Sequence, residues 1–505
     1  MTIAKSLEIC SVLLACAGLI ASGAGAAAAG VDASRQSFPD ASGVITTLSV
    51  NGPIDSHGAF FQSLGTNERT CATCHVASQA MSISAAGIQL RFLETRGRDP
   101  LFAAVDGANC PNARQDNAAD HSLLLQHGLI RIFLKPPATA QFSISVVHDP
   151  YGCAITTDPT DGRPIVSVYR RPLPTTNLGF LSTIMFDGRE TKQPLNVRAT
   201  FPTNLVADLT QQAIDAIAIH AQGTQTPSVA QLDDIIDFEL GLYSAQTYDN
   251  AAESLRADGA YGGPRYLATD LSAAYYPGIN DSLGADPNGV AFDPDAMELY
   301  SAWVAAGEDA YPDTLHREQA IRDEARRDIA AGETLFDSAP VHISNVRGLN
   351  DNPALGNPTT FTGTCTTCHD TPNTGNHSFP LPLDIGTGHS VLPGAETDSN
   401  IAAGLAELSM PDLPVYRIDC PNPFNAGQPA SIYTTDPGKA LISGLCSDFN
   451  RGKGPILRGL AARAPYFHNG AAADLNELIN FYNERFQMNL TAEQKRQLVA
   501  FLNSL

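Results

Sequence analysis

The sequence predicts a mainly α-helical protein with long irregular loops, built from two similar parts. The pattern C-x-x-C-H occurs twice, at residues 71–75 and 365–369, which suggests that one structural unit is repeated. The stretches 259–294 and 411–439 are rich in Pro and Gly, so we expect irregular connections there. Elsewhere apolar residues recur at helical spacing. Two such stripes are Val229, Leu232, Ile236, Leu240 and Tyr243, and Leu498, Phe501, Leu502 and Leu505.

Local signals place the helices around the second C-x-x-C-H copy. Residues 324–336 have the apolar spacing of a helix, and a Gly-, Asn- and Pro-rich loop, 345–363, separates this helix from the copy. Near the C-terminus, Thr491 and Gln494 have the spacing of a capping box. We therefore expect a helix that begins directly after Thr491.

Each C-x-x-C-H copy is typical of a covalently attached c-type haem. The two thiols add to the porphyrin vinyl groups, and the histidine that follows reaches the iron. A zinc knuckle or a redox dithiol is the alternative, but zinc would need two such pairs close together in the chain. The predicted attachment residues are Cys71, Cys74 and His75 for the first haem, and Cys365, Cys368 and His369 for the second.

Two haem motifs imply two cytochrome c-like haem domains. We expect an N-terminal haem domain with insertions over residues 30–320 and a C-terminal haem domain over residues 321–505. The junction should lie near residues 313–322, before the helix that leads to the second motif.

The first 29 residues are expected to be a secretory signal peptide. Lys5 precedes an apolar run, and small residues follow it up to Ala29. A lipoprotein cleavage box that ends at Cys16 is an alternative. Either interpretation places the mature protein in the periplasm, and no later segment is long and apolar enough to span a bilayer.

Four cysteines lie outside the signal and the haem motifs. An even number of such cysteines in an exported protein suggests disulfides rather than free thiols. Proximity in the sequence favours a Cys110–Cys153 and a Cys420–Cys446 pair.

The composition is strongly acidic. A formal net charge of −22 argues against nucleic acid as a partner. The charge would suit a basic electron donor, such as a small cytochrome or a cupredoxin, although an acidic surface can also serve solubility alone.

The segment 454–470, G-P-I-L-R-G-L-A-A-R-A-P-Y-F-H-N-G, adds a longer motif to the two haem motifs. Together they resemble the bacterial di-haem cytochrome c peroxidase and MauG superfamily. In peroxidases of that superfamily, a Met fourteen residues after the histidine of P-Y-F-H ligates the second haem, and that position is Tyr482 here. A tyrosine there is similar to MauG, and Tyr482 lies on one apolar helix face with Leu475 and Ile479. Tyr482 could instead be a core aromatic residue, and His468, Met488 and His377 are the substitute ligands.

The segment 185–190, M-F-D-G-R-E, is similar to the superfamily's F-W-D-G-R-A, whose tryptophan relays electrons between the haems. Phe186 stands at that position, and Trp303 lies elsewhere in the chain. Because phenylalanine is hard to oxidise, we expect no hopping relay through this side chain.

The resemblance also implies a distal pocket and a calcium site. Gln212 matches the superfamily's distal glutamine, and the distal glutamate position falls near His220 and Gln222. His220 could move a proton between the two oxygens of peroxide at neutral pH, or it could simply end a helix. Arg171 replaces the asparagine that ligates calcium, so calcium is left open. Candidate sixth ligands of the first haem are His57, His121 and His127, and candidate propionate partners are Arg69, Arg189 and Arg458.

Taken together, these features predict an exported di-haem oxidoreductase. The main expectation is reduction of hydrogen peroxide with electrons from a small donor protein. A MauG-like or rubber-oxygenase-like reaction with O₂ is the enzymatic alternative. A non-enzymatic electron carrier, with both irons six-coordinate, is the third interpretation.

Overall fold

Helices and antiparallel sheets share the described chain, so the expected mainly α, cytochrome c-like fold is wrong. Only 34% of the residues are helical and 16% lie in strands. The computed structural model describes residues 33–191, 201–284, 286–306, 317–376, 381–390, 399–406, 408, 410–421 and 431–505. The expected signal segment with Cys16 and the ligand candidate His377 lie outside the described residues.

Several of the longer helices lie close to the sequence predictions. The helix expected over residues 324–336 is part of α7, and the capping box of Thr491 and Gln494 is confirmed at the start of α11. The helices are α1 (Ala85–Thr95), α2 (Ser122–His127), α3 (Phe201–Ile219), α4 (Val229–Leu240), α5 (Pro264–Tyr266), α6 (Ser272–Ala274), α7 (Arg317–Ser338), α8 (Ser399–Leu405), α9 (Ala440–Ser443), α10 (Leu475–Arg485) and α11 (Ala492–Asn503).

The strands form four antiparallel sheets among the described residues, in the orders β1-β2-β7-β8, β3-β6-β5, β12-β11-β4 and β10-β9. Their sequences are rich in β-branched residues, as in I-V-S-V-Y of β6, where Val166 and Val168 are fully buried. The strands are β1 (Arg35–Pro39), β2 (Gly43–Ser49), β3 (Ile130–Leu134), β4 (Ser143–His148), β5 (Ile155–Thr157), β6 (Pro164–Arg170), β7 (Leu242–Asp249), β8 (Glu253–Ser254), β9 (Val341–Ser344), β10 (Thr360–Gly363), β11 (Val415–Asp419) and β12 (Ser431–Thr434).

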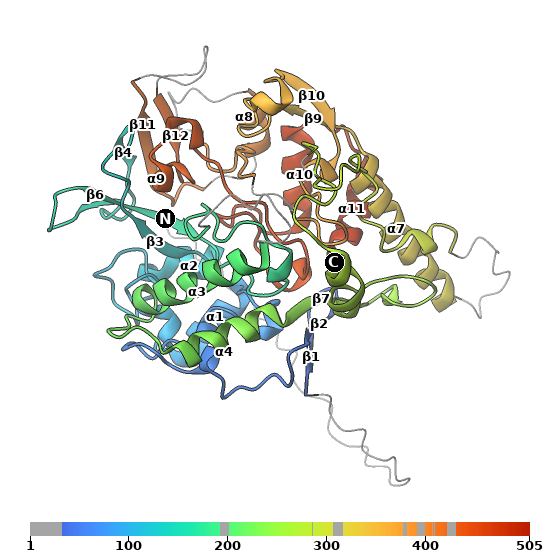
Figure 1. Ribbon diagram of the computed structural model, residues 1–505, viewed down its shortest axis with the longest axis horizontal. Helices are drawn as coiled ribbons and strands as arrows, with labels where there is room; N and C mark the ends of the chain where they lie inside the picture. The colour runs from blue at the N-terminus through green and yellow to red at the C-terminus, as the bar shows by residue number, and fades with distance from the viewer. Residues whose placement is uncertain are drawn as a thin grey trace, which may run out of the picture. The chain divides into compact units, whose positions relative to one another are not determined.

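One sheet joins segments from opposite halves of the chain. β4 pairs with β11 so that Ile144 lies opposite Ile418 and Ser145 opposite Arg417. Figure 1 shows β4 beside β11 and β12 at one side of the molecule. Residues 33–505 form one compact unit, and the expected boundary near residue 320 stays a prediction.

The largest hydrophobic core surrounds α7, α10 and α11, which lie together in Figure 1. Gly332 allows the close approach of α7 to α11, because a Cβ at this position would overlap the carbonyl oxygen of Gln497. Trp303 and Tyr300, from the segment before α7, are also fully buried in this core. The core therefore draws on residues from both expected domains.

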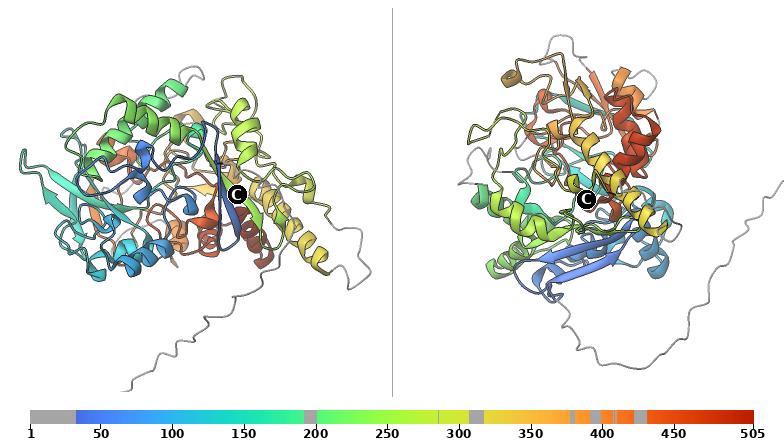
Figure 2. Two further views of the ribbon diagram at one scale, coloured as in Figure 1. Left: turned by 90° about the horizontal axis from the view of Figure 1, so that it is seen from below. Right: turned by 90° about the vertical axis from the view of Figure 1, so that its right-hand side faces the viewer.

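The N-terminal sheet packs beside the C-terminus of the chain. The backbone N–H of Gln246 in β7 donates to the carbonyl oxygen of Leu505 (3.3 Å). The hydroxyl of Tyr300 donates to the carbonyl oxygen of Ser504 (2.8 Å). Figure 2 shows the C-terminus next to β1 and β2. No described helix has the length and apolarity that crossing a membrane requires.

Candidate functional site

A pair of threonines closes the 3-10 turn that begins each C-x-x-C-H copy. In the first copy, the N–H of Thr70 donates to Thr73 Oγ1 (3.0 Å), and the N–H of Thr73 donates to the Thr70 carbonyl (3.1 Å). Thr364 and Thr367 make the same two bonds in the second copy, at 2.9 and 3.1 Å. These threonines were not predicted as site residues, although the longer repeat T-C-x-T-C-H is visible in the sequence.

The motif cysteines are unpaired thiols that lie on the walls of two cavities. Cys71 and Cys74 line the first cavity, and Cys365 and Cys368 line the second. Burial raises the pKa of the Cys71 thiol to about 12 and that of the Cys74 thiol to about 11. Both thiols of the first pair are therefore neutral at physiological pH.

His75 is held in the orientation that a metal-ligating histidine needs. Its Nδ1 lies 3.1 Å from the carbonyl oxygen of Met81, which can only accept, so Nδ1 carries the proton. Burial lowers the pKa of His75 to about 4, and the ring is therefore neutral. A neutral imidazole with its proton on Nδ1 presents the Nε2 lone pair for coordination.

The first cavity brings His75 together with side chains from α3. The empty volume of this cavity, including the solvent-filled space at its opening, is about 1580 Å³. The polar or charged side chains that line it include Gln62, Arg69, Asp106, Arg189, Gln212, His220 and Glu239.

Two of the three predicted distal residues line the first cavity. Gln212 and His220 share its wall, and His220 Nδ1 is hydrogen bonded to Asp106. Gln222 is exposed and does not line the cavity; its carbonyl oxygen accepts a bond from Thr66 Oγ1 (3.0 Å). Gln222 therefore has no contact with the cavity through which it could act on a substrate.

The second cavity is lined by His369 and by three of the predicted ligand candidates, Tyr482, Met488 and His468. Its empty space, counted in the same way, is about 1710 Å³. Tyr482 and Met488 both line it, and burial raises the pKa of the Tyr482 hydroxyl, so the phenol is neutral in the protein alone. Tyr482 and Met488 therefore share this cavity with His369.

The two cavities share one wall. Seven residues line both of them, at four separate places in the chain. Phe186 and His468 are stacked in this wall with their ring centroids 4.5 Å apart, and the guanidinium of Arg170 lies 4.9 Å from the centroid of Phe186. Trp303 lines neither cavity. The shared residues are Arg171, Pro172, Leu173, Pro174, Phe186, Lys453 and His468.

A buried ionic network supports this wall. Arg170 binds Asp436 through two hydrogen bonds of 2.6 and 2.9 Å and donates a third, of 2.5 Å, to Asp187. Burial opposes the ionisation of Asp436, but Arg170 outweighs it and keeps the pKa of Asp436 below its usual value. His468 Nε2 lies 3.8 Å from Asp436, while burial lowers the pKa of His468 to about 4. The stacked imidazole is therefore neutral.

The predicted sixth-ligand histidines of the first haem do not line either cavity. His57 is exposed and lies 2.9 Å from Asp55 through Nδ1. Both ring nitrogens of His121 face carbonyl oxygens, those of Gly107 and Arg114. His127 Nδ1 lies 3.2 Å from the carbonyl oxygen of Gly470.

The residues around Arg171 do not fit a calcium ion. The guanidinium of Arg171 donates to the carbonyl oxygens of Ile83 (2.5 Å), His127 (3.1 Å) and Arg463 (2.7 Å). Carbonyl oxygens are calcium ligands, but here a fixed organic cation already binds them. Among the described residues, no group of three or more His, Cys, Asp or Glu is placed to hold a metal ion.

The residues around the two cavities fit two covalent haems. Each cavity has two unpaired thiols and a motif histidine on its wall. Arg189 also lines the first cavity. Arg458 follows Leu457 of the second cavity, is fully buried, and has no hydrogen-bond partner on any guanidinium nitrogen within the described chain. Arg458 lines neither cavity, and burial lowers its pKa to about 10, against the buried Glu333, an acidic group that raises it.

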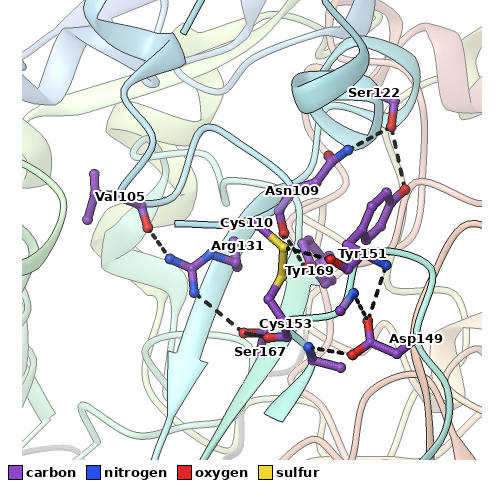
Figure 3. Close-up of a disulfide and its surroundings, with 12 residues drawn as sticks. Val105, Asn109, Cys110, Ser122, Arg131, Asp149, Tyr151, Cys153, Ser167 and Tyr169 are labelled. Carbon is purple, nitrogen blue, oxygen red and sulfur yellow. Dashed lines mark hydrogen bonds between the residues drawn. A yellow bond between two sulfur atoms is a disulfide. The ribbon is translucent and has the colours of Figure 1, made fainter. Parts of the chain in front are cut away.

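Two disulfides brace the segments outside the cavities. The structure joins Cys110 to Cys153 and Cys420 to Cys446, with Cα atoms 6.0 and 6.3 Å apart. Figure 3 shows the first disulfide beside Tyr169, whose hydroxyl donates to the Asn109 carbonyl (2.6 Å). These are the two pairs that sequence proximity favours. Each closes a loop of the polypeptide, which reduces the conformational entropy of the unfolded chain.

Comparison with known proteins supports a relationship to cytochrome c peroxidases over part of the chain. No protein-family model matches the sequence. Over 78 residues the chain is 38% identical to cytochrome-c peroxidase IdrP2 of Denitromonas iodatirespirans. The matched segment is 14% of this chain and 21% of the length of that relative. The chain is therefore similar, over this segment, to a cytochrome c peroxidase.

Proposed function

We propose that the protein is an exported di-haem oxidoreductase of the bacterial cytochrome c peroxidase and MauG type that reduces hydrogen peroxide in the periplasm. The observation that carries this proposal is the first cavity, in which an oriented His75 shares the walls with Gln212 and His220. The partial similarity to a cytochrome c peroxidase supports the same reaction. The two disulfides support an oxidising compartment.

In this proposal, the residues of each cavity have distinct roles. His75 and His369 would each hold one iron, with the paired thiols of each motif joined to the porphyrin. Haem, when bound, supplies the redox centre that binds peroxide and exchanges electrons. Gln212 and His220 bind and orient peroxide, and His220 carries the proton between its two oxygens. In balance, one hydrogen peroxide, two protons and two electrons yield two waters.

Electrons would come from a small basic donor. The net charge of −22 favours attraction of a basic cytochrome or cupredoxin at low ionic strength. The second cavity receives the electrons, and the shared wall with Phe186 and His468 separates it from the first.

A second candidate function is an oxidase or oxygenase reaction with O₂. Tyr482 in the second cavity and Phe186 in the shared wall favour it, because both differ from the residues of ordinary peroxidases in this superfamily. Tyr482 is the residue that would ligate the second haem iron, with His468 and Met488 as the substitutes.

Turnover measurements on the holoprotein test these proposals. We expect two haems per chain in the pyridine haemochrome assay, a high-spin signal in electron paramagnetic resonance, and peroxide-dependent oxidation of a reduced small cytochrome c. Two fully low-spin haems that consume no peroxide, even after reduction, would contradict both enzymatic functions. Stable O₂ binding by the ferrous protein without peroxide turnover would select the oxygenase.

A further inference from the structure

A buried ion pair lies directly behind His220. His220 follows the last residue of α3, and its Nδ1 is hydrogen bonded to one carboxylate oxygen of Asp106. The other carboxylate oxygen of Asp106 accepts a bond from Arg69. The side chains of Asp106 and Arg69 are 1% and 3% exposed, so water does not compete for these bonds. His220 itself is 28% exposed, at the wall of the first cavity.

Arg69 fixes this arrangement through the backbone as well. Its Nε donates to the carbonyl oxygen of Pro100 (2.8 Å), and its second terminal nitrogen donates to that of Leu101 (2.8 Å). The nitrogen that binds Asp106 also lies 3.2 Å from the carbonyl oxygen of His220. The Arg69 guanidinium therefore holds both the Asp106 carboxylate and the main chain of His220.

The charge state of Asp106 determines the tautomer of His220. Burial opposes ionisation, but Arg69 and His220 outweigh it and hold the pKa of Asp106 below its usual range. An ionised carboxylate only accepts hydrogen bonds, so the bonded Nδ1 must carry a proton. In a neutral His220 the lone pair is then on Nε2, which has no hydrogen-bond partner among the described residues.

We propose that Asp106 is a positioning residue that, held by Arg69, fixes His220 as a base toward the first cavity. The inference rests on the proposed function and names the residues that make its proton transfer work. A proton leaves the inner oxygen of hydrogen peroxide for His220 Nε2. The same proton passes to the outer oxygen as the O–O bond breaks, and that oxygen leaves as water. Two electrons from the donor protein and two protons from solvent then convert the inner oxygen to a second water, so that one peroxide yields two waters.

Cyanide binding to the as-isolated holoprotein tests this inference without peroxide turnover. Hydrogen cyanide must lose its proton to bind iron as cyanide, so a cavity base speeds the reaction. We expect Asp106→Asn and His220→Gln each to slow cyanide association by about 100-fold, the lower end of general-base effects. The double variant should be no slower than either single variant, because the two residues act as one unit.

Asp328→Asn is the matched control. Asp328, in α7, pairs with Arg496, and neither residue lines the first cavity. This variant should bind cyanide at nearly the wild-type rate. If Asp106→Asn does not fold, Asp106→Glu replaces it; we expect an association rate between those of the wild type and His220→Gln.

Three outcomes would overturn the inference. These are wild-type cyanide kinetics in the Asp106 variant, additive losses in the double variant, and a wild-type protein that binds no cyanide. Failure of the proposed function looks different, because cyanide kinetics then follow the expected pattern while peroxide is not consumed.

Discussion

Phe186 and His468 stack face to face between the two cavities, with ring planes inclined by only 13°. Phe186 comes from the segment after β6, and His468 belongs to the C-terminal P-Y-F-H segment. The stack therefore joins distant parts of the chain in the wall that the two cavities share. Gly452 packs against the edge of the Phe186 ring, since a Cβ there would overlap that ring.

Gly452→Ala should disturb this stack. The added methyl must displace the Phe186 ring that stacks on His468, and overpacking of this kind typically costs about 1–3 kcal/mol. We expect a lower melting temperature and slower electron transfer from the second haem to the first after rapid reduction. Gly179→Ala is the control, because a Cβ at Gly179 meets no atom within 4 Å. Unchanged electron transfer in Gly452→Ala would show that the stack is not on the path.

Tyr482→Phe should change the spectrum of the second haem with little effect on folding. The Tyr482 hydroxyl lies at the second cavity and makes no hydrogen bond to another described side chain or backbone group. Its removal should therefore alter the free energy of unfolding by less than about 1 kcal/mol. Electron paramagnetic resonance of the ferric protein provides the measurement. A spectral change in Met488→Leu, but none in Tyr482→Phe, would assign Met488 as the ligand.

Arg171 should make the protein independent of calcium. Its guanidinium binds three carbonyl oxygens that would otherwise be buried without a donor. Arg171→Met should therefore lower the free energy of unfolding by about 3 kcal/mol or more. Arg417→Met, at a half-exposed ion pair with Asp419, should change it by less than about 0.5 kcal/mol.

The calcium part of this prediction is checked with a chelator. Neither the melting temperature nor the haem spectra of the wild type should change on treatment with EGTA or on addition of calcium. A calcium-dependent rise in melting temperature would contradict the assignment of Arg171 as the cation that these carbonyl oxygens bind.

Glu333 should make the protein less stable as the pH rises toward neutrality. Burial raises the pKa of Glu333 from 4.5 to about 7, against the backbone N–H groups of Leu299 and Tyr300 that favour its ionised form. Between pH 4.5 and 7 the folded state therefore holds a proton that the unfolded state has lost, and the free energy of unfolding falls. Glu333→Gln should flatten this slope in urea titrations at pH 5, 6 and 7. An unchanged slope would show that Glu333 is already ionised when folded.

The sequence was sufficient for features that depend on near neighbours. It predicted the position of α4, α7, α10 and α11, because each has an apolar stripe and a local capping or breaking signal. The motif residues and the pairing of Gln212 with His220 at one cavity follow from short patterns and a family resemblance.

Features that depend on distant partners were missed. The β-branched runs in β4 and β6 were not interpreted as strands, because the haem motifs suggested an α-helical fold. β4 also finds its partner β11 only in the second half of the chain. Asp106 belongs to no recognisable sequence motif. Its role depends on contacts with Arg69 and with His220, which lies more than one hundred residues away in the chain. Arg171 was recognised as a departure from a calcium ligand, but not as the cation that takes its place.

The pairing of β4 with β11 has a consequence for how the protein matures. A ribosome makes β4 long before β11, so this strand has an unpaired edge while most of the chain is still being synthesised. The first cavity also depends on residues that are synthesised late, because Lys453, Ile456 and His468 form part of its walls. Its cysteine pair is made first, yet the cavity acquires its final walls last.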